Sequence, residues 1–595
     1  MTWGPDASDT SAAWHVLLSL GGTGALYLSA GETITRSTQG ASRVWQALPM
    51  DLGPIEEEFS DGLIRAPRIG SYTVEITDDD QGTLQAWYEN NDGALGRKVS
   101  IWASDDDATT AELVFDGVID EPSDAVFDYS TKVLELRVMD RRTSEDQNVP
   151  PNTLDPDNPD YEYIDDAWKG RPIPILYGDW SEGRVHHSGS MRRPVIEAVA
   201  IDTGVHRGVG QYAMRFQVCD PGTNGIAYIG DRVWIKYGNS AAHGSEWSWM
   251  NTSSIDLDTS CFSVSTTEIE AQSYRYQIGD RFFVYCKGNA DGAGNVIENP
   301  LLILRDLWNN YASPVTENND WFDSFSTEYL HFSGSRARAR LVDQEPLIDV
   351  SDRLCTEFNM IWGVKPEESG GVWDTVYWAR RFDPWNTSGN ATPTADYRPA
   401  WGSISSEPII KPAETDLYAD RLRVLYRYHP LLEIWSKLKE ANVSGLKYLP
   451  WNPGGAGYVT REIETTWLWR KADAYRLIDQ QALLYSRKRL VWEFPAWGWP
   501  MNVYLGDAVQ WQSTNDNDAR RGIVIGRRVD LQSGECELTV LDCSDRVEYY
   551  ARWTSDTEDV YDDQDTDGKR IWGFWTDEDG LCDPPDSTSD DSHWI

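Results

Sequence analysis

Histidine, paired cysteines and catalytic motifs are scarce in this sequence of 595 residues, and each absence excludes a class of protein. The eight histidines are scattered along the chain, and no HExxH or GxSxG motif occurs. Metalloprotease and serine-hydrolase chemistry therefore has little basis. The seven cysteines form no CxxC pair, which argues against a disulfide framework or a structural zinc site. We expect buried free thiols at Cys219, Cys261, Cys286, Cys355, Cys536, Cys543 and Cys582.

The distribution of charged and apolar residues also shows no pattern typical of a secretory leader or a membrane span. Residues 1–20 have no basic start, and the apolar stretch Trp14–Leu20 is too short for a secretory core. No run approaches the roughly 18 apolar residues that a membrane-spanning helix requires. We therefore expect a soluble protein without a membrane span, made in a reducing cytoplasm.

Positive charge is in short supply. The chain has 53 Lys and Arg residues against 96 Asp and Glu residues, so its formal net charge is −43. Nucleic-acid binding needs clustered basic residues that displace counterions, and this balance argues against it. A composition this acidic repels polyanions and keeps a large assembly in solution.

Aromatic side chains, in contrast, are abundant. The chain has 29 Trp, 28 Tyr and 14 Phe residues within a hydrophobic fraction of 40%. Aromatic rings bring much apolar area for little rotamer entropy and are enriched in strands and in interfaces. At roughly 150 residues per domain, the length suggests about four domains. The composition therefore predicts several β-rich domains with large buried interfaces.

Strands separated by turns are predicted for the first 165 residues. In residues 71–77, apolar and polar side chains alternate with the period of a half-buried strand. Turn signals follow at 78–82 and 90–93. This spacing predicts a small antiparallel barrel or sandwich, ending in a linker rich in Pro, Asp and Asn at 146–160. Further strands of this unit are expected at 97–102, 113–119 and 132–138.

Helices are expected in the middle of the chain. Asn299 is a cap residue before Pro300 at the first position of a helix that continues to Tyr311. A second helix is predicted to start near Asp343, with Pro346 in its first turn, and a third to cover about 470–488. The apolar residues of these two helices form one-sided stripes typical of core packing: Leu347, Val350, Leu354 and Phe358, and Ala474, Ile478, Ala482 and Tyr485.

The remaining segments are predicted to be strands. Two prolines at alternate positions make 171–178 an edge or connecting segment. The best strands of a β-rich region at 190–290 are 212–218, 232–237 and 282–285. A second small barrel-like unit is predicted from strands at 491–494, 507–510, 522–529 and 536–541, with turns at 515–517 and 533–534. The predicted fold class is mainly β with helical insertions (α+β, multidomain), with two small β-barrel domains and central helix- and β-rich domains.

An acidic extension ends the chain. Residues 554–595 hold 14 acidic residues against Lys569 and Arg570, and we expect this segment to be draped on a neighbour or partly disordered. The expected domains are an N-terminal β-barrel domain (1–165), a β-rich domain (166–298), a central helical α+β domain (299–415), a second barrel domain with a helix (416–550) and an acidic C-terminal extension (551–595).

Few motifs suggest chemistry. Gly21–Gly24 lacks the residues of a phosphate-binding loop and is interpreted as a β-turn. His186 and His187 have no further ligand at metal-binding spacing. Asp563–Gly568 matches the first half of a calcium loop, but position twelve is Phe574, so a solvated acidic turn is the better interpretation. Carboxylate pairs are too abundant to identify a glycosidase site, and packing in cores and interfaces explains the Trp excess better than a sugar platform. No catalytic, cofactor-binding or metal-binding residue is assigned, and no cofactor is expected.

The order of the segments resembles that of the tail hub (baseplate hub) proteins of tailed bacteriophages. The similarity extends over residues 90–545 and depends on the order of its parts, since each part is mainly strand and turn chemistry. The extension after Asp542 has no counterpart in the family. The segments that resemble the family are 91–93, 95–101 and 115–119 (first barrel), 171–178 (a phrase frequent in tail-tip proteins), 299–307 and 343–358 (central helices), and 505–509 and 522–526 (closing barrel).

This resemblance implies a structural virion protein at the tail tip, made in the host cytoplasm, and no enzymatic residues. It implies two barrels like those of the tail-tube protein and a homotrimer, whose six barrels match a six-fold tube. The implied partners are the tail tube protein, the distal tail protein and tip or fibre proteins. Phage DNA passes through the channel without specific binding, because fixed negative charge keeps it from the wall.

Two other functions stay open at this stage. One is an acidic, Trp-rich glycan-binding or glycan-degrading tail protein. The other is a neighbouring tail component, such as a distal-tail or fibre-attachment protein. A glycosidase should have a cleft with two facing carboxylates, whereas a tail hub should place two tube-like barrels around helices.

Overall fold

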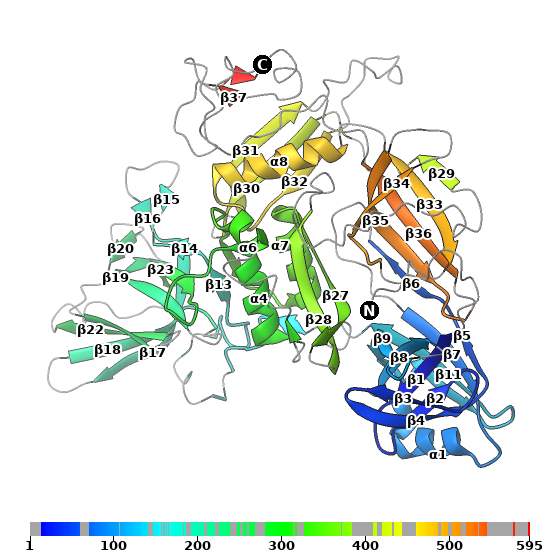
Figure 1. Cartoon of the computed structure of the whole chain (residues 1–595). Helices are drawn as coiled ribbons and strands as arrows, with labels where there is room; N and C mark the ends of the chain where they lie inside the picture. The colour runs from blue at the N-terminus through cyan, green and yellow to red at the C-terminus, as the bar shows by residue number, and fades with distance from the viewer. Residues whose placement is uncertain are drawn as a thin grey trace.

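Strands dominate the computed structural model of this chain, and helices are few (Figure 1). The strands form one 16-stranded sheet, one 8-stranded sheet and two 3-stranded sheets, besides several two-stranded pairs. The predicted class, mainly β with helical insertions in several domains, is confirmed. The structure describes residues 14–59, 71–105, 108–140, 147–155, 157–158, 161, 164, 166–181, 184–185, 192–206, 211–220, 225–238, 247–249, 254–258, 261–267, 280–312, 316–317, 327–369, 372–382, 409–412, 419, 421–430, 433–442, 460–485, 489–497, 503–512, 519–532, 535–543, 575–576 and 593–594.

The N-terminal β unit contains the strands predicted from the alternating pattern. In β11 (Val133–Asp140), Leu134, Leu136 and Val138 are buried, and the strand pairs with β7 (Ser71–Thr77). A short helix, α1 (Thr83–Asn90), lies between the two predicted turns and was not expected. The other elements are β1 (Trp14–Leu20), β2 (Leu26–Ser29), β3 (Ile34–Thr38), β4 (Ala41–Ala47), β5 (Met50–Leu52), β6 (Ile55–Glu58), η1 (Asp92–Ala94), β8 (Lys98–Asp105), β9 (Glu112–Val118), η2 (Pro122–Asp124) and β10 (Ala125–Asp128).

The C-terminal β unit continues the same sheet. Strand β35 (Ala519–Val529) pairs with β6, with Val529 opposite Ile55 and Gly526 opposite Glu58. The strand order is β29-β33-β36-β35-β6-β7-β11-β9-β8-β1-β2-β4-β3, with β5, β10 and β34 on its sides. The other strands of this unit are β29 (Ile409–Pro412), β33 (Leu490–Trp497), β34 (Ala508–Gln512) and β36 (Glu535–Asp542).

The two β units predicted as small barrels are therefore not closed barrels, since their strands are continuous in one sheet. Both β units belong to one sheet, because residues 526–529 of β35 pair with β36 on one edge and with β6 of the other unit on the opposite edge. The sheet curls in the N-terminal unit, because the consecutive strands β4 and β5 pair with different parts of it: β4 pairs with β2, and β5 pairs with β7. The two units lie one above the other on one side of the molecule (Figure 1).

Three helices and a long hairpin occupy the centre. Helix α4 (Pro300–Tyr311) begins as predicted, with Asn299 Oδ1 accepting a hydrogen bond of 2.9 Å from Leu301 N. Helix α7 (Leu347–Glu357) begins later than expected, because Pro346 is extended (ψ 136°) and Glu345 pairs with Val149. Its predicted stripe is buried. The other central elements are β24 (Thr316–Glu317), α6 (Thr327–Phe332), β27 (Met360–Ser369) and β28 (Val372–Arg381).

The 8-stranded sheet lies on the other side of the central helices from the 16-stranded sheet (Figure 1). Its order is β20-β19-β23-β17-β18-β22-β21, with β14 beside β23, and the three predicted strands fall on β18, β19 and β23. Phe216, Phe262 and Phe282 pack together in its core. The bounds are β14 (Asp179–Trp180), β17 (Ile196–His206), β18 (Gln211–Gln217), β19 (Ile226–Lys236), β20 (Trp247–Trp249), β21 (Ser254–Asp258), β22 (Cys261–Thr267) and β23 (Arg281–Asn289).

A small sheet covered by a helix forms the last unit (Figure 1). Strand β30 (Arg421–His429) pairs with β31 (Ile434–Asn442) and with β32 (Thr460–Glu464). Helix α8 (Lys471–Tyr485) confirms the third predicted helix, and its stripe residues Ala474, Ile478 and Tyr485 are buried. Short paired strands complete the fold: β12 (Asn148–Val149), β13 (Ile175–Tyr177), β15 (Arg184–Val185), β16 (Arg192–Arg193), β25 (Ala339–Leu341), β26 (Glu345–Pro346), β37 (Trp575–Thr576) and β38 (His593–Trp594).

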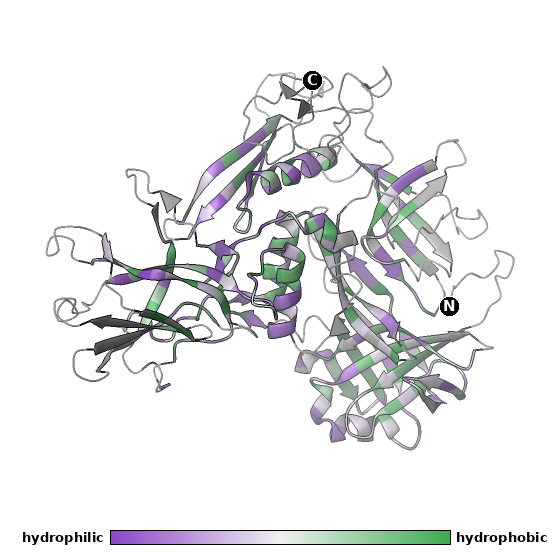
Figure 2. Ribbon diagram, turned by 60° about the vertical axis from the view of Figure 1, so that its left-hand side comes forward, coloured by the Kyte–Doolittle hydropathy of each residue, from purple (hydrophilic) through white to green (hydrophobic). Residues whose placement is uncertain are grey.

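The hydropathy pattern agrees with this architecture. Apolar residues concentrate on the central helices and on alternate positions of the strands (Figure 2). The prediction of buried free thiols is confirmed for six of the seven cysteines; Cys582 lies outside the described residues. None of the helices in the described part of the chain is long and apolar enough to cross a membrane.

Candidate functional site

Polar side chains converge where the central helices meet the α8 unit. Glu357, the last residue of α7, is buried and accepts four hydrogen bonds. Its Oε1 accepts from Thr466 N (2.8 Å) and Thr466 Oγ1 (3.1 Å), and its Oε2 from Trp467 N (2.7 Å) and Leu468 N (3.2 Å). Burial raises the pKa of Glu357 to about 7, although the donors of Thr466 and Trp467 oppose the rise. The carboxylate thus anchors the segment that leads into α8.

An acidic residue is unexpected at the position of Glu357, so hydrogen-bond partners are needed to stabilise it there. The C-terminal end of a helix disfavours negative charge, and Glu357 lies three residues after Leu354 on the apolar stripe of α7. Sequence reasoning did not single it out. The sequence did contain a signal for Glu357, because a charged residue within a predicted core stripe requires buried hydrogen-bond partners.

A small pocket lies beside Glu357 and is also lined by His331, Asp473 and Arg476. Its volume of about 20 Å³ gives room for about one water molecule, not for a sugar ring. Burial, together with Arg381 and Arg476, lowers the pKa of His331 to about 4, so this imidazole is neutral at pH 7. Since backbone donors occupy both oxygens of Glu357, the pocket does not present two carboxyl groups to a substrate as a glycosidase does.

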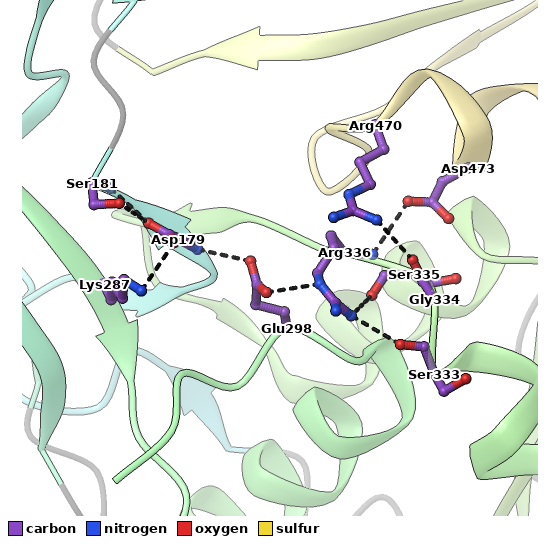
Figure 3. A network of polar contacts seen from close by, with 10 residues as sticks. All are labelled: Asp179, Ser181, Lys287, Glu298, Ser333, Gly334, Ser335, Arg336, Arg470 and Asp473. Atoms are coloured by element: carbon purple, nitrogen blue, oxygen red, sulfur yellow. Dashed lines mark hydrogen bonds and ion pairs between the residues drawn. The ribbon is translucent and has the colours of Figure 1, made fainter. Parts of the chain in front are cut away.

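A continuous polar network links three units (Figure 3). Lys287 in β23 forms an ion pair with Asp179 in β14 (3.3 Å), and the backbone N of Asp179 donates to Glu298 Oε1 (3.2 Å). The other oxygen of Glu298 pairs with Arg336 Nε (3.0 Å), and Arg336 N donates to Asp473 Oδ2 in α8 (3.2 Å). The network therefore connects the 8-stranded sheet, the central helices and α8.

Cation–π contacts reinforce the same junction. The guanidinium of Arg338 lies 4.3 Å from the ring centroid of Trp469 and 5.9 Å from that of Trp180. The two indole rings are themselves 5.7 Å apart. Trp180 belongs to β14 and Trp469 precedes α8, so the arginine is held between two units.

The central hairpin β27–β28 contacts both β units. Arg380 in β28 pairs with Asp507 Oδ1 (3.0 Å) and donates to the carbonyl of Gly506, in the C-terminal unit. Thr375 Oγ1 donates to Asp116 Oδ2 (3.2 Å) in β9 of the N-terminal unit. Lys98 also pairs with Asp116, at 2.8 Å. One hairpin therefore holds the two β units to the central helices.

The chemistry of these junctions is that of a rigid scaffold. Their charged groups are paired with each other or with backbone groups, as buried charges must be. Within the described ranges, no group of three or more His, Cys, Asp or Glu residues is placed to hold a metal ion. The arrangement fixes the relative positions of the sheets.

Of the three motifs considered as candidate sites in the sequence, one lies in the described part of the structure. Gly21–Gly24 is the turn between β1 and β2, as predicted. Gly22 has a φ of 103°, and a Cβ there would lie 2.3 Å from Asn91 Oδ1, which accepts a hydrogen bond from Thr23 N. The His186–His187 pair, the Asp563–Gly568 motif and Phe574 lie outside the described residues.

The structure of this chain is similar to several solved structures. No family model matches the sequence, and no curated protein matches it. A chain of the native gene transfer agent particle virion is 13% identical, with a TM-score of 0.36, over 65% of this chain and 88% of that chain. A tail protein from Neisseria meningitidis MC58 is 9% identical, with a TM-score of 0.34, over 88% and 96% of the two chains. The 43 kDa tail protein of prophage MuSo2 from Shewanella oneidensis is also 9% identical, with a TM-score of 0.34, over 89% and 96%.

These three similar structures are named as tail or virion proteins. This is the class of protein that the sequence resembles.

Proposed function

We propose that this chain is a structural protein of a virion tail, a trimeric hub at the tail tip. In this role it joins the tail tube to the distal tail protein and to tip or fibre proteins, and it surrounds the channel for DNA ejection. One observation carries the proposal. The two β units come from opposite ends of the chain, yet they lie side by side in one sheet through β6 and β35.

The side-by-side placement has a consequence for symmetry. A closed trimer of such chains presents six β units, arranged as three pairs. A six-fold tube offers six equivalent docking positions, so a trimer with two units per chain matches it without leaving positions empty. The hairpin β27–β28 fixes both units through Arg380 and Thr375, which keeps the pair rigid enough to dock together.

The charge of the chain fits a channel for DNA. A formal net charge of −43 per chain repels phosphate groups. Repulsion keeps a passing duplex from adhering to the wall, so DNA is a transient neighbour in this proposal and not a ligand. We propose a scaffolding role without catalysis, and the polar groups described above act by holding the units together.

Measurements of mass and symmetry test the proposal. Light scattering on the purified chain is expected to give three times 67.4 kDa, and electron microscopy to give a threefold ring with an axial opening. The pairs of β units should lie on one face of that ring. A monodisperse monomer at high concentration, in both low and high salt and also after addition of the tail tube protein, would overturn the proposal.

A further inference from the structure

The outer face of the 8-stranded sheet has an unusual composition at its β20 edge. The inner face of β19 and β23 is apolar, with Ile235, Phe282 and Val284 in the core of the unit. Outer faces of antiparallel sheets usually carry polar side chains. Here the register places Trp234 opposite both Trp249 in β20 and Phe283 in β23, so these three aromatic residues share the outer face.

A second row of the same face repeats this pattern. Lys236 is opposite Trp247 on one side and Arg281 on the other. The ring centroids of Trp234 and Trp249 are 5.7 Å apart, and those of Trp247 and Phe283 are 5.1 Å apart. We call this surface the aromatic platform; it consists of Trp234, Trp247, Trp249, Phe283 and Tyr285, with Tyr228 on the same face.

The aromatic platform has a buried base and an exposed upper layer. Phe283 is 0% exposed and Trp234 is 7% exposed, whereas Trp249 is 46% exposed and Tyr228 is 45% exposed. Because the exposed ring of Trp249 contacts the buried Trp234, it extends a contiguous apolar surface, and such patches mark interaction surfaces. An edge-to-face contact with Trp234 and a tilted contact with Phe283 fix the orientation of Trp249 and Trp247, respectively.

Cations surround these rings. The guanidinium of Arg232 lies 5.8 Å from the ring centroid of Trp249, and Lys236 Nζ lies 5.9 Å from that of Trp247. Arg281 lies 5.5 Å from the centroid of Phe283 and forms two hydrogen bonds of 2.6 Å with Glu197. The aromatic surface is therefore bordered by positive charge, although the chain as a whole is strongly acidic.

The unit that carries the platform does not share the acidity of the chain. Residues 192–289 contain nine Lys and Arg residues and ten Asp and Glu residues, a net charge of 9 − 10 = −1, compared with −43 for the whole sequence. At physiological salt, where the Debye length is about 8 Å, an anionic ligand therefore meets little local repulsion at this unit. The unit also lies on the opposite side of the central helices from the 16-stranded sheet (Figure 1).

We propose that the aromatic platform binds an acidic saccharide, one that bears a carboxylate or a phosphate group. The apolar face of a sugar ring stacks on an indole, and rigid exposed rings such as Trp249 accept it with little loss of entropy. The exposed Arg232, beside the Trp249 ring, is placed to bind the acidic substituent. The proposal depends on this unit alone and not on the role in the tail.

Binding of the full chain to an array of bacterial capsular and lipopolysaccharide oligosaccharides tests the proposal. We expect saturable binding to members with uronate or phosphate groups and weaker binding to neutral members. Trp249→Ala should weaken binding about tenfold or more, because it removes the exposed stacking surface. Arg232→Ala should reduce both the affinity and its dependence on salt. Tyr129→Ala removes a ring that is 59% exposed in the N-terminal β unit and should leave binding unchanged.

Three results would overturn the inference. One is the absence of saturable binding to every acidic member of the array. Another is equal binding by the wild type and Trp249→Ala. The third is a loss of the oligomer mass in Trp249→Ala, which would make the platform a subunit interface. A mass of one chain for the wild type together with glycan binding would instead refute the trimeric hub and leave the saccharide site intact.

Discussion

Single residues decide how the units of this chain are joined, and Glu357 is the clearest case. A buried carboxylate is costly unless hydrogen bonds satisfy it, and four donors from residues 466–468 do so here. Its partners are 109 to 111 positions away in the sequence, which is why pattern reasoning could not name them. The cap of α4, in contrast, was predictable because Asn299 and Leu301 are neighbours.

Removal of the carboxylate should release the segment before α8. In Glu357→Ala, the buried backbone N–H groups of residues 466–468 lose their acceptor and a cavity forms, at a cost of about 3 kcal/mol. Hydrogen exchange at those amides should become faster by a corresponding factor. The matched control is Glu368→Ala on the exposed surface of β27, which should change stability by less than about 0.5 kcal/mol. Unchanged exchange in Glu357→Ala would contradict the anchoring role.

The same residue predicts a pH dependence. Burial raises the pKa of Glu357 from 4.5 to about 7, so between these values the folded state binds a proton that the unfolded state has lost. This contribution to stability is fully present below about pH 4.5 and is lost as the pH rises through 7. Glu357→Gln cannot titrate, so the difference in melting temperature, wild type minus variant, should be larger at pH 5 than at pH 8. Parallel profiles for the two proteins would show that the carboxyl group titrates normally.

At the scale of elements, local patterns were informative and long-range pairing was not. The stripes of α7 and α8 and the alternation in β7 and β11 predicted their types, because periodicity reflects which face is buried. Helix α1 was missed; it has only eight residues, and only Leu84 and Trp87 of them are buried. The pairing of β6 with β35 joins residues about 470 positions apart, and no local signal encodes it.

The β6–β35 junction offers a comparison between two neighbouring arginines. Arg527 is 3% exposed, pairs with Glu57 (3.2 Å) and lies 4.7 Å from the ring centroid of Tyr504, whereas Arg528 and its partner Glu56 are more than half exposed. Arg527→Ala leaves Glu57 largely buried without its cation and should cost about 2–3 kcal/mol. Arg528→Ala should cost less than about 0.5 kcal/mol.

Hydrogen exchange of the amides in β6 and in residues 526–529 measures this difference. Loss of protection in both strands is expected only for Arg527→Ala. Equal effects of the two substitutions would mean that the junction depends on backbone pairing alone.

At the scale of the whole molecule, charge is distributed unevenly. Residues 421–485 contain ten Lys and Arg residues and six Asp and Glu residues, a net charge of 10 − 6 = +4, so the rest of the chain carries −47. Composition alone predicted repulsion of polyanions, but it could not show that positive charge is concentrated in the unit formed by β30, β31, β32 and α8. The proposed trimer carries 3 × −43 = −129 in total, and the sign of the field far from the surface follows the total.

The repulsive channel therefore predicts that duplex DNA does not bind the assembled protein. In a gel-retardation assay we expect no shift at about 150 mM salt, where the Debye length is about 8 Å. At about 10 mM salt the Debye length increases to about 30 Å, so repulsion by the net charge reaches further and should still prevent binding. A shift seen only at low salt and abolished by the double substitution Arg470→Glu and Lys471→Glu would confine DNA contact to the cationic unit, because both residues are exposed there. Retardation at 150 mM salt would contradict repulsion as the mechanism, since binding would then overcome the charge of the entire trimer.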